Sequence, residues 1–453
     1  MKKIYGLLVV GTMLTACNPE WLDVKRELNL TVPATLDDFR ALLNYNLLQN
    51  DYLGLAELSA DDYVTDEASY QVIGDVERNA YSWKGDTYGG ANTVTEWNNA
   101  YQQIFQCNVV VHGLGKLTPK HNEKGYYNML LGEALFHRGR AFFNLAQLFA
   151  PPFHPSTAPE MLGIPLRLDP DPNMQTVRAS LKDTYNQILE DLRRSSRLLG
   201  EESFSGNALL PRKAAAFAAL ARCYLVMGDY QKSGLYADSA LQSQNGLLDF
   251  DTMDPQVDYP VSRLNSEIIF QSTLAPLYTV FSRHFGFTPT GLFSIYDKRD
   301  LRRSIYFQDV ANDEVGFRGS YNGSVQLFSG TTTAEMYLIR AESNLRIGQP
   351  EPALSDLNLL RKHRCKPTDF YQLEITATPG LLDTIIAERK RELVRRGLRW
   401  MDLRRLNQDP STAETLARTM NGQVFNLQPN SKRYTFPIPD YIIDATGMEQ
   451  NER

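Results

Sequence analysis

The sequence has little tryptophan or cysteine, and it lacks the motifs of the common enzyme classes. Tryptophan and cysteine each occur four times in 453 residues, and the six histidines include no pair at metal-binding spacing. No G-x-S-x-G sequence occurs. Residues 113–116, Gly-Leu-Gly-Lys, lack the earlier glycine and the following serine or threonine of a phosphate-binding loop. Neighbouring acids such as Asp61 and Asp62 point apart on a helix or strand, so they do not alone form the opposed acid pair of a glycosidase. These absences favour a binding protein over an enzyme, and they predict no metal and no cofactor.

An excess of positive charge and long apolar runs are also missing. The chain has 47 Lys and Arg against 53 Asp and Glu, a formal net charge of −6, so we expect no nucleic-acid partner. After the N-terminal segment, no stretch approaches the roughly 18 apolar residues of a membrane-spanning helix. Cys107, Cys223 and Cys365 lie in or beside expected helices without metal-ligand spacing. We predict buried free thiols, with one disulfide as the alternative in an oxidising compartment.

The N-terminal residues form a targeting segment rather than part of the fold. Two lysines precede the apolar residues 4–14, and small residues stand directly before Cys17. This arrangement resembles a bacterial lipoprotein signal, which implies removal of residues 1–16, lipid attachment at Cys17 and a tether over 17–34. The alternative is an ordinary secretory signal with an incidental cysteine. Early acidic residues in the tether resemble a surface-export signal, so we expect a lipid anchor in the outer membrane at the cell surface.

Two helical hairpins share one design. In the second hairpin, apolar residues at i, i+4, i+7 and i+11 form one helical stripe, namely Ala334, Leu338, Ala341 and Leu345. Gly348 then suits a left-handed cap, and Pro350 suits the first turn of the next helix. A similar stripe ends at Gly228, 120 residues earlier (348 − 228). These hairpins resemble tetratricopeptide repeats, and an ordinary α-helical bundle is the alternative.

The predicted fold class is mostly α, with helical hairpin repeats and long irregular insertions in one domain over 35–453. Apolar periodicity places the repeat helices at about 35–60, 95–150, 178–245, 333–365 and 380–406. The period fails over about 66–92 and 250–330, which we predict to be loop-rich insertions that carry the ligand site.

Six segments, in order along the chain, resemble segments of the SusD/RagB lipoproteins. They are residues 17–23, 132–153 with 163–168, 219–230, 334–348, 388–404 and 436–439. Two departures stand out. Arg396 occupies the position of a family glutamate, so we expect the ion pairs around Gly397 to close differently. Only Gln450 and Asn451 remain of the family's C-terminal ending, which leaves the packing of the chain end open.

The resemblance implies a function in nutrient capture without catalysis. Its members are surface partners of TonB-dependent transporters of the SusC type, and they hold an oligosaccharide or polysaccharide over the transporter like a hinged lid. Relatives of the RagB type are associated with peptides, so a peptide-binding version is the first alternative. A surface glycan hydrolase and a scaffold without a ligand are the others.

The basic segment from Glu388 to Arg405 allows two interpretations. Eight basic residues against three acids suggest either an anionic-sugar site or a packed seam of ion pairs. Glu388 and Glu392 lie one helical turn apart, and Trp400 and Leu403 supply apolar contacts, so we predict the seam.

Ligand contacts are expected where aromatic residues crowd into irregular sequence, because a sugar ring presents an apolar face and a rim of hydroxyls. The residues that we nominate are, first, Trp83 with Tyr81, Asp86 and Tyr88, and second, Tyr278, Tyr296, Asp297 and Arg299. Core packing beneath a loop is the alternative for each. Trp97 and Trp400 lie on helical stripes and are predicted to be core residues.

Overall fold

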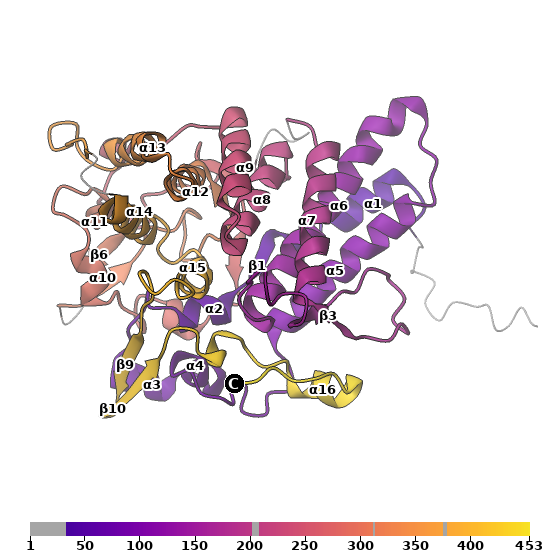
Figure 1. Cartoon of the computed structure of the whole chain (residues 1–453), viewed down its shortest axis with the longest axis horizontal. Helices are drawn as coiled ribbons and strands as arrows, with labels where there is room; N and C mark the ends of the chain where they lie inside the picture. Colours follow the sequence, from indigo (N-terminus) through magenta and orange to yellow (C-terminus); the bar gives the residue numbers. More distant parts are fainter. Residues whose placement is uncertain (1–32, 202–207, 311–312, 375–377) are drawn as a thin grey trace, which may run out of the picture.

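The computed structural model describes residues 33–201, 208–310, 313–374 and 378–453, and these are mostly helical (Figure 1). The predicted signal over 1–16, the lipidation site at Cys17 and almost all of the tether lie outside the described residues. The longer helices are α5 (Thr95–Leu114), α6 (Lys124–Phe149), α7 (Leu181–Leu198), α8 (Lys213–Met227), α9 (Tyr230–Ser243), α12 (Thr333–Arg346), α13 (Pro350–Lys362) and α14 (Thr378–Glu392). The shorter ones are α1 (Leu36–Leu43), α2 (Gly54–Ser59), α3 (Glu67–Val72), α4 (Asp75–Tyr81), α10 (Thr290–Ser294), α11 (Arg302–Ile305), α15 (Arg399–Leu406) and α16 (Asp440–Thr446).

The strands are short and pair two by two in the described part of the chain. The parallel pair is β1 (Asn50–Tyr52) with β5 (Thr273–Ala275). The antiparallel pairs are β2 (Leu162–Pro165) with β3 (Arg178–Ser180), β4 (Ile268–Phe270) with β8 (Thr331–Thr332), β6 (Phe307–Asp309) with β7 (Val315–Phe317), and β9 (Leu416–Met420) with β10 (Gln423–Leu427). Single turns of 3-10 helix lie at Asn46–Gln49, His121–Glu123, Phe250–Thr252, Thr279–Phe281 and Lys432–Tyr434.

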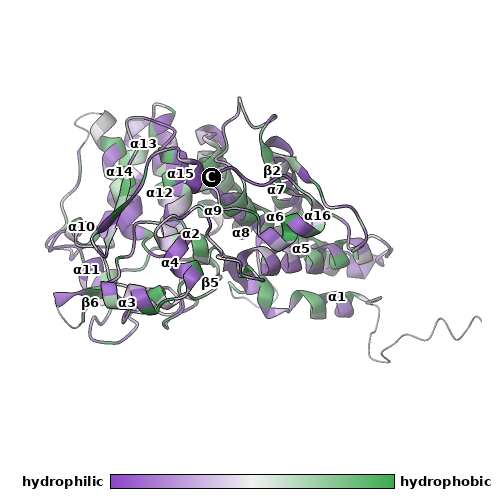
Figure 2. Cartoon of the chain, turned by 90° about the horizontal axis from the view of Figure 1, so that it is seen from below, coloured by the Kyte–Doolittle hydropathy of each residue, from purple (hydrophilic) through white to green (hydrophobic). Residues whose placement is uncertain are grey.

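The long helices form one continuous array. Helix α6 packs against α5 and α7, α8 packs against α7 and α9, and α12 packs against α9, α13 and α14. Figure 1 shows this order across the molecule, from α1, α5 and α6 at one end to α12, α13 and α14 at the other. Hydrophobic and hydrophilic residues alternate along these helices, so each has an apolar side to bury against its neighbours (Figure 2). The predicted mostly α fold with helical hairpins is confirmed.

The hairpin turns have the backbone geometry that their glycines predict. Gly228 and Gly348 have φ values of +73° and +82°, where a side chain would be strained. Pro350 stands in the first turn of α13, and the Asp229 side chain caps α9 by accepting from the backbone N–H of Lys232 at 3.1 Å. Each turn therefore reverses the chain at once and lets the two helices pack along their length.

The segment 66–92 is not the irregular loop that its sequence predicts. It contains α3 and α4, of six and seven residues. The carboxylate of Asp66 caps α3 by accepting from the backbone N–H of Ser69 at 2.6 Å. Helices this short show too few turns to produce a clear 3.6-residue period, which is why periodicity missed them.

Most aromatic residues of the 250–330 insertion form a second hydrophobic core rather than a surface. Tyr296, Tyr306, Phe307 and Tyr321 are buried together around β6 and β7. The ring centroids of Tyr296 and Phe307 lie 5.0 Å apart and nearly edge to face. The aromatic crowding thus marks the local core of a segment that has little regular structure.

The basic segment after α13 is a buried network of ion pairs, as predicted. Glu392, at the end of α14, accepts from Arg302 at 2.8 Å and from Arg364 at 2.8 and 3.0 Å. Arg364 also binds Glu267 at 2.7 Å, and Arg302 binds Glu388 at 2.7 Å. All five side chains are almost fully buried. The network joins α11, α14 and the segments before α12 and after α13.

Arg396 packs against an aromatic ring instead of forming the ion pair of a family glutamate. Its guanidinium carbon lies 3.9 Å from the ring centroid of Tyr321, so a cation–π contact stands where the family glutamate would pair. Gly397 has a φ of +74°, and its N–H donates to the Glu57 carboxylate of α2 at 2.8 Å. This hydrogen bond therefore holds α2 against the start of α15.

Glu57 makes the stability of the fold depend on pH. Burial, followed by the nearby Asp62 carboxylate, raises the pKa of Glu57 from 4.5 to about 8. Between these two pKa values the folded protein binds more protons than the unfolded chain. The free energy of unfolding therefore falls as pH rises from about 4.5 to about 8. Glu57→Gln keeps an acceptor for the Gly397 N–H and removes the charge. We expect a smaller decline between about pH 5 and 8 in urea denaturation, and an equal decline in both proteins would contradict this account.

The three cysteines of the described chain are free, which confirms the prediction of free thiols. Cys107 and Cys223 are buried, and Cys365 is half-buried. Burial raises the pKa of the Cys107 thiol to about 12. None of the described helices is both long and apolar enough to span a bilayer.

Candidate functional site

The first group of nominated residues lies mostly in the protein interior. Trp83 is 2 % exposed, and its Nε1 donates to a carbonyl at the end of α2 at 2.9 Å. The guanidinium carbon of Arg418, on β9, lies 3.8 Å from the ring centroid of Tyr81 and 4.6 Å from that of Trp83. Tyr88 is buried as well, whereas Asp86 is exposed. A sugar platform at Trp83 therefore does not fit this conformation, because α2 and Arg418 cover the ring.

The second group of nominated residues is divided between two places. Tyr278 packs against the main core and donates its hydroxyl to Glu96 at 2.9 Å, whereas Tyr296 is buried in the second core. Burial raises the pKa of Glu96 to about 7. Asp297 and Arg299 are exposed, and they form an ion pair at 2.9 Å on the edge of a cleft of about 220 Å³. Asp297 and Arg299 lie together at this cleft.

A different cleft, of about 310 Å³, lies beside α5 and has aromatic walls; we call it the aromatic cleft. Trp97, Tyr101 and Phe105 stand at i, i+4 and i+8 on one side of this helix. Trp97 is 4 % exposed and Phe105 is 47 % exposed, with the half-buried Tyr101 between them. The centroids of the Trp97 and Tyr101 rings lie 4.8 Å apart. The stripe thus begins in the core, as predicted for Trp97, and ends at the surface.

The opposite wall of the aromatic cleft is the loop between β2 and β3, together with α16. Arg167 holds this loop in shape by donating to the carbonyls of residues 171 and 174 at 2.7 and 3.1 Å. Asn108 donates to the Arg167 carbonyl at 2.9 Å, and the Tyr101 hydroxyl donates to the Pro165 carbonyl at 2.9 Å. Burial raises the pKa of Tyr101 well above its ordinary value, so the hydroxyl remains a donor. These bonds tie the loop to α5 and fix the cleft.

The aromatic cleft combines an apolar surface with a polar rim. The phenyl ring of Phe105 supplies exposed apolar area, and Arg167, Asp169 and Thr176 supply hydrogen-bonding groups. Sequence analysis assigned this helical stripe to the core and missed Phe105. The available signal was aromatic side chains that repeat every four residues along α5, at Trp97, Tyr101 and Phe105.

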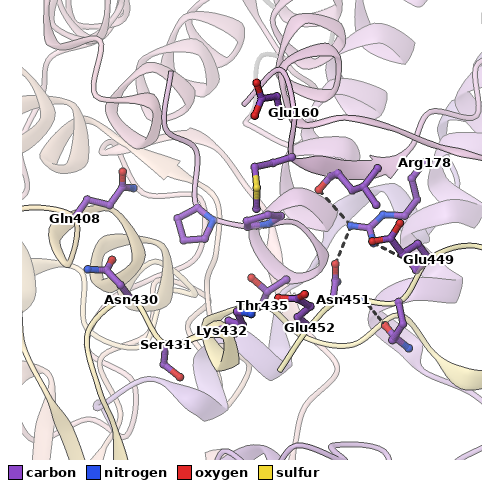
Figure 3. A pocket seen from close by; sticks show the side chains of 15 residues that line it. Glu160, Arg178, Gln408, Asn430, Ser431, Lys432, Thr435, Glu449, Asn451 and Glu452 are labelled. Atoms are coloured by element: carbon purple, nitrogen blue, oxygen red, sulfur yellow. Dashed lines mark hydrogen bonds and ion pairs between the residues drawn. The ribbon is translucent and has the colours of Figure 1, made fainter. Parts of the chain in front are cut away.

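A further cleft, beside the chain end, has a volume of about 510 Å³ (Figure 3). Figure 3 shows Arg178 among its lining residues, and this side chain donates to the carbonyls of residues 163 and 449 at 2.9 Å and to Asn451 at 2.8 Å. Asn451 in turn donates to the carbonyls of Phe149 and Phe436 at 2.8 Å. The packing of the chain end, which the sequence left open, is therefore well defined. These polar groups hold the fold, and no aromatic residue lines the cleft.

Two family models match the chain. Residues 20–225 match a SusD-like model described as starch-binding and associating with the outer membrane, and residues 332–452 match the model of the SusD family. The chain belongs to the SusD family. This confirms the resemblance found in the sequence. No curated protein sequence matches the chain.

Solved structures share the SusD fold over nearly the whole chain. A SusD superfamily protein from Bacteroides thetaiotaomicron VPI-5482 is 22 % identical, with a TM-score of 0.76 over 92 % of this chain and 100 % of that one. A SusD-like carbohydrate binding protein from Bacteroides vulgatus ATCC 8482 is 19 % identical, with a TM-score of 0.71 over 92 % and 97 %. Surface glycan-binding protein A from Bacteroides uniformis is 16 % identical, with a TM-score of 0.72 over 92 % and 99 %.

The aromatic cleft of this SusD-family chain has few acidic side chains. Among the residues that line the aromatic cleft, Asp169 is the single carboxylate, so no opposed pair of acids faces a ligand there. In the described part of the chain, no three His, Cys, Asp or Glu side chains gather as metal ligands.

Proposed function

We propose that the protein is a surface lipoprotein that binds an oligosaccharide or polysaccharide in the aromatic cleft and delivers it, without catalysis, to a SusC-type TonB-dependent transporter in the outer membrane. The observation that carries this proposal is the fixed cleft beside α5, where exposed Phe105 faces a loop with a polar rim. A sugar ring stacks its C–H face on an aromatic ring and gives its hydroxyls to the rim.

Family membership and the N-terminal sequence support the remaining parts of the proposal. One matching family model is described as starch-binding and associating with the outer membrane. The lysines, apolar run and Cys17 of the N-terminal segment fit a lipid anchor. Tethering the ligand at the membrane raises its local concentration over the transporter, which is the benefit of binding without chemistry.

Phe105→Ala is expected to weaken glycan binding by about tenfold or more, because truncating a central aromatic contact typically removes more than about 1 kcal/mol. The protein is expressed from Asn18 onward and run through gels that contain neutral polysaccharides, with retardation as the measure of affinity. Tyr45→Ala is the matched control, since Tyr45 is an aromatic residue of similar exposure that lies outside the cleft.

The outcomes separate the alternatives. Retardation by at least one polysaccharide that Phe105→Ala weakens and Tyr45→Ala leaves unchanged supports the proposal. New reducing ends in the bound glycan would identify a hydrolase instead. Binding of peptides alone, measured in the same way with immobilised peptides, would contradict the glycan assignment, and retention of neither would contradict ligand binding altogether.

A further inference from the structure

The cleft of about 220 Å³ lies at the opposite end of the helical array from α5, and four arginine and four acidic side chains line it; we call it the arginine cleft. It is formed by the residues between α10 and α11, the end of α13 with its following loop, and one side of α14. Figure 1 shows α11, α13 and α14 grouped at this end of the molecule. Arg299, Arg302, Arg361 and Arg391 all reach the cleft.

Most charges in the arginine cleft are already paired. Arg299 binds Asp297 at 2.9 Å, and Arg302 binds Asp300 at 2.7 Å. Glu388 accepts from Arg391 at 2.7 Å and also binds Arg302. The hydrogen bonds from Arg299 hold the pKa of Asp297 well below its ordinary value. These pairs satisfy one another and leave little charge for a ligand.

Arg361 is different, because no carboxylate of the described residues lies within ion-pair distance of it. Its one hydrogen bond is a 3.3 Å contact from Nη1 to the Tyr371 carbonyl, in an exposed position. The guanidinium carbons of Arg361 and Arg299 each lie 4.8 Å from the ring centroid of Tyr371, which is 49 % exposed. Stacking on this ring holds the planar guanidinium group of Arg361 in place, while most of its N–H donors stay available for a ligand.

The surroundings of Arg361 add positive charge and a hydroxyl acceptor. Lys366 is exposed and forms no ion pair with the described residues. Asp369 lines the same cleft, and its carboxylate accepts only a 3.4 Å hydrogen bond from its neighbour Thr368. A ligand that suits this arrangement carries one planar anionic group that accepts from the Arg361 guanidinium. It also carries nearby hydroxyls that donate to the Asp369 carboxylate.

We propose that the arginine cleft is a binding subsite for an acidic sugar, with the carboxylate of a uronic acid residue on Arg361 and ring hydroxyls on Asp369. This inference rests on the proposed glycan-binding function and adds a ligand class to it. The captured glycan then carries uronic acid residues, and the chain contacts it at two separate places, one aromatic and one ionic.

The experiment compares tetragalacturonate with its methyl-esterified form, which has the same sugar rings without the charges, in calorimetric titrations. We expect the acid form to bind and the ester to bind about tenfold more weakly or not at all, because the ester loses the charge-assisted hydrogen bonds to Arg361. Arg361→Gln should weaken binding of the acid form by about the same factor as esterification does. Lys362→Gln, which removes one positive charge from the next residue, is the matched control and should change affinity less than about twofold.

The inference is overturned if tetragalacturonate does not bind, if the ester binds equally well, or if Lys362→Gln weakens binding as much as Arg361→Gln. Thermal unfolding of Arg361→Gln shows whether its fold is intact, and Arg361→Lys, which keeps the positive charge but loses the planar guanidinium group, is a second variant that should also weaken binding of the acid form. Failure here is distinct from failure of the proposed function. Retention of neutral glycans that depends on Phe105 would persist if only the arginine cleft is misassigned.

Discussion

Replacing Glu392 by glutamine is expected to lower the free energy of unfolding by about 3–5 kcal/mol. Glu392 accepts hydrogen bonds from Arg302 and Arg364, and all three side chains are buried. Although burial alone would raise it, the guanidinium groups of Arg364 and then Arg302 hold the pKa of Glu392 below its ordinary value. The neutral variant removes the negative charge that Arg302 and Arg364 share inside the buried network.

Urea denaturation at neutral pH measures this loss. Glu351→Gln is the matched control, because Glu351 is an exposed residue of α13 that forms no ion pair with the described residues, and it should change stability by less than about 0.5 kcal/mol. A loss in Glu392→Gln no larger than in the control would show that the ion-pair network does not hold α11, α14 and the segment after α13 together.

Cys17→Ser is expected to move the protein almost completely from the membrane fraction to the soluble fraction. Lipid at this cysteine is the proposed anchor, and no described helix is able to replace it in the bilayer. The measurement is the partition of the full chain between the membrane pellet and the supernatant after cell lysis.

Cys365→Ser is the control for the anchor, because Cys365 is a half-buried free thiol within the folded domain. It should remain with the membranes. Retention of Cys17→Ser in the membrane fraction at the wild-type level would contradict the lipid anchor and would leave the protein held there by another contact.

The features that the sequence predicted well depend on neighbouring residues. Gly348 and Pro350 mark a hairpin turn because each fixes backbone geometry at its own position. The acids and arginines of α14 indicated a buried seam because residues one turn apart share a helix side. The partners that complete the network, such as Glu267 for Arg364, are 97 residues away and carry no local signal.

The candidate site was harder to predict because exposure depends on segments distant in sequence. Trp83 sits between polar and glycine residues, which suggests an exposed loop, but Arg418 on β9 covers its ring. The reverse holds for Phe105, since its stripe on α5 looks like a core pattern although Phe105 itself is 47 % exposed. The spacing of hydrophobic residues along a helix does not by itself distinguish a buried aromatic stripe from one that reaches solvent.

The most direct test of glycan capture in the aromatic cleft is a crystal structure of the protein soaked with an oligosaccharide that the gel assay retains. The account predicts a sugar ring stacked on Phe105, with hydroxyls within hydrogen-bond distance of Asp169 or Thr176. Sugar density only elsewhere, with the aromatic cleft holding solvent, would contradict it.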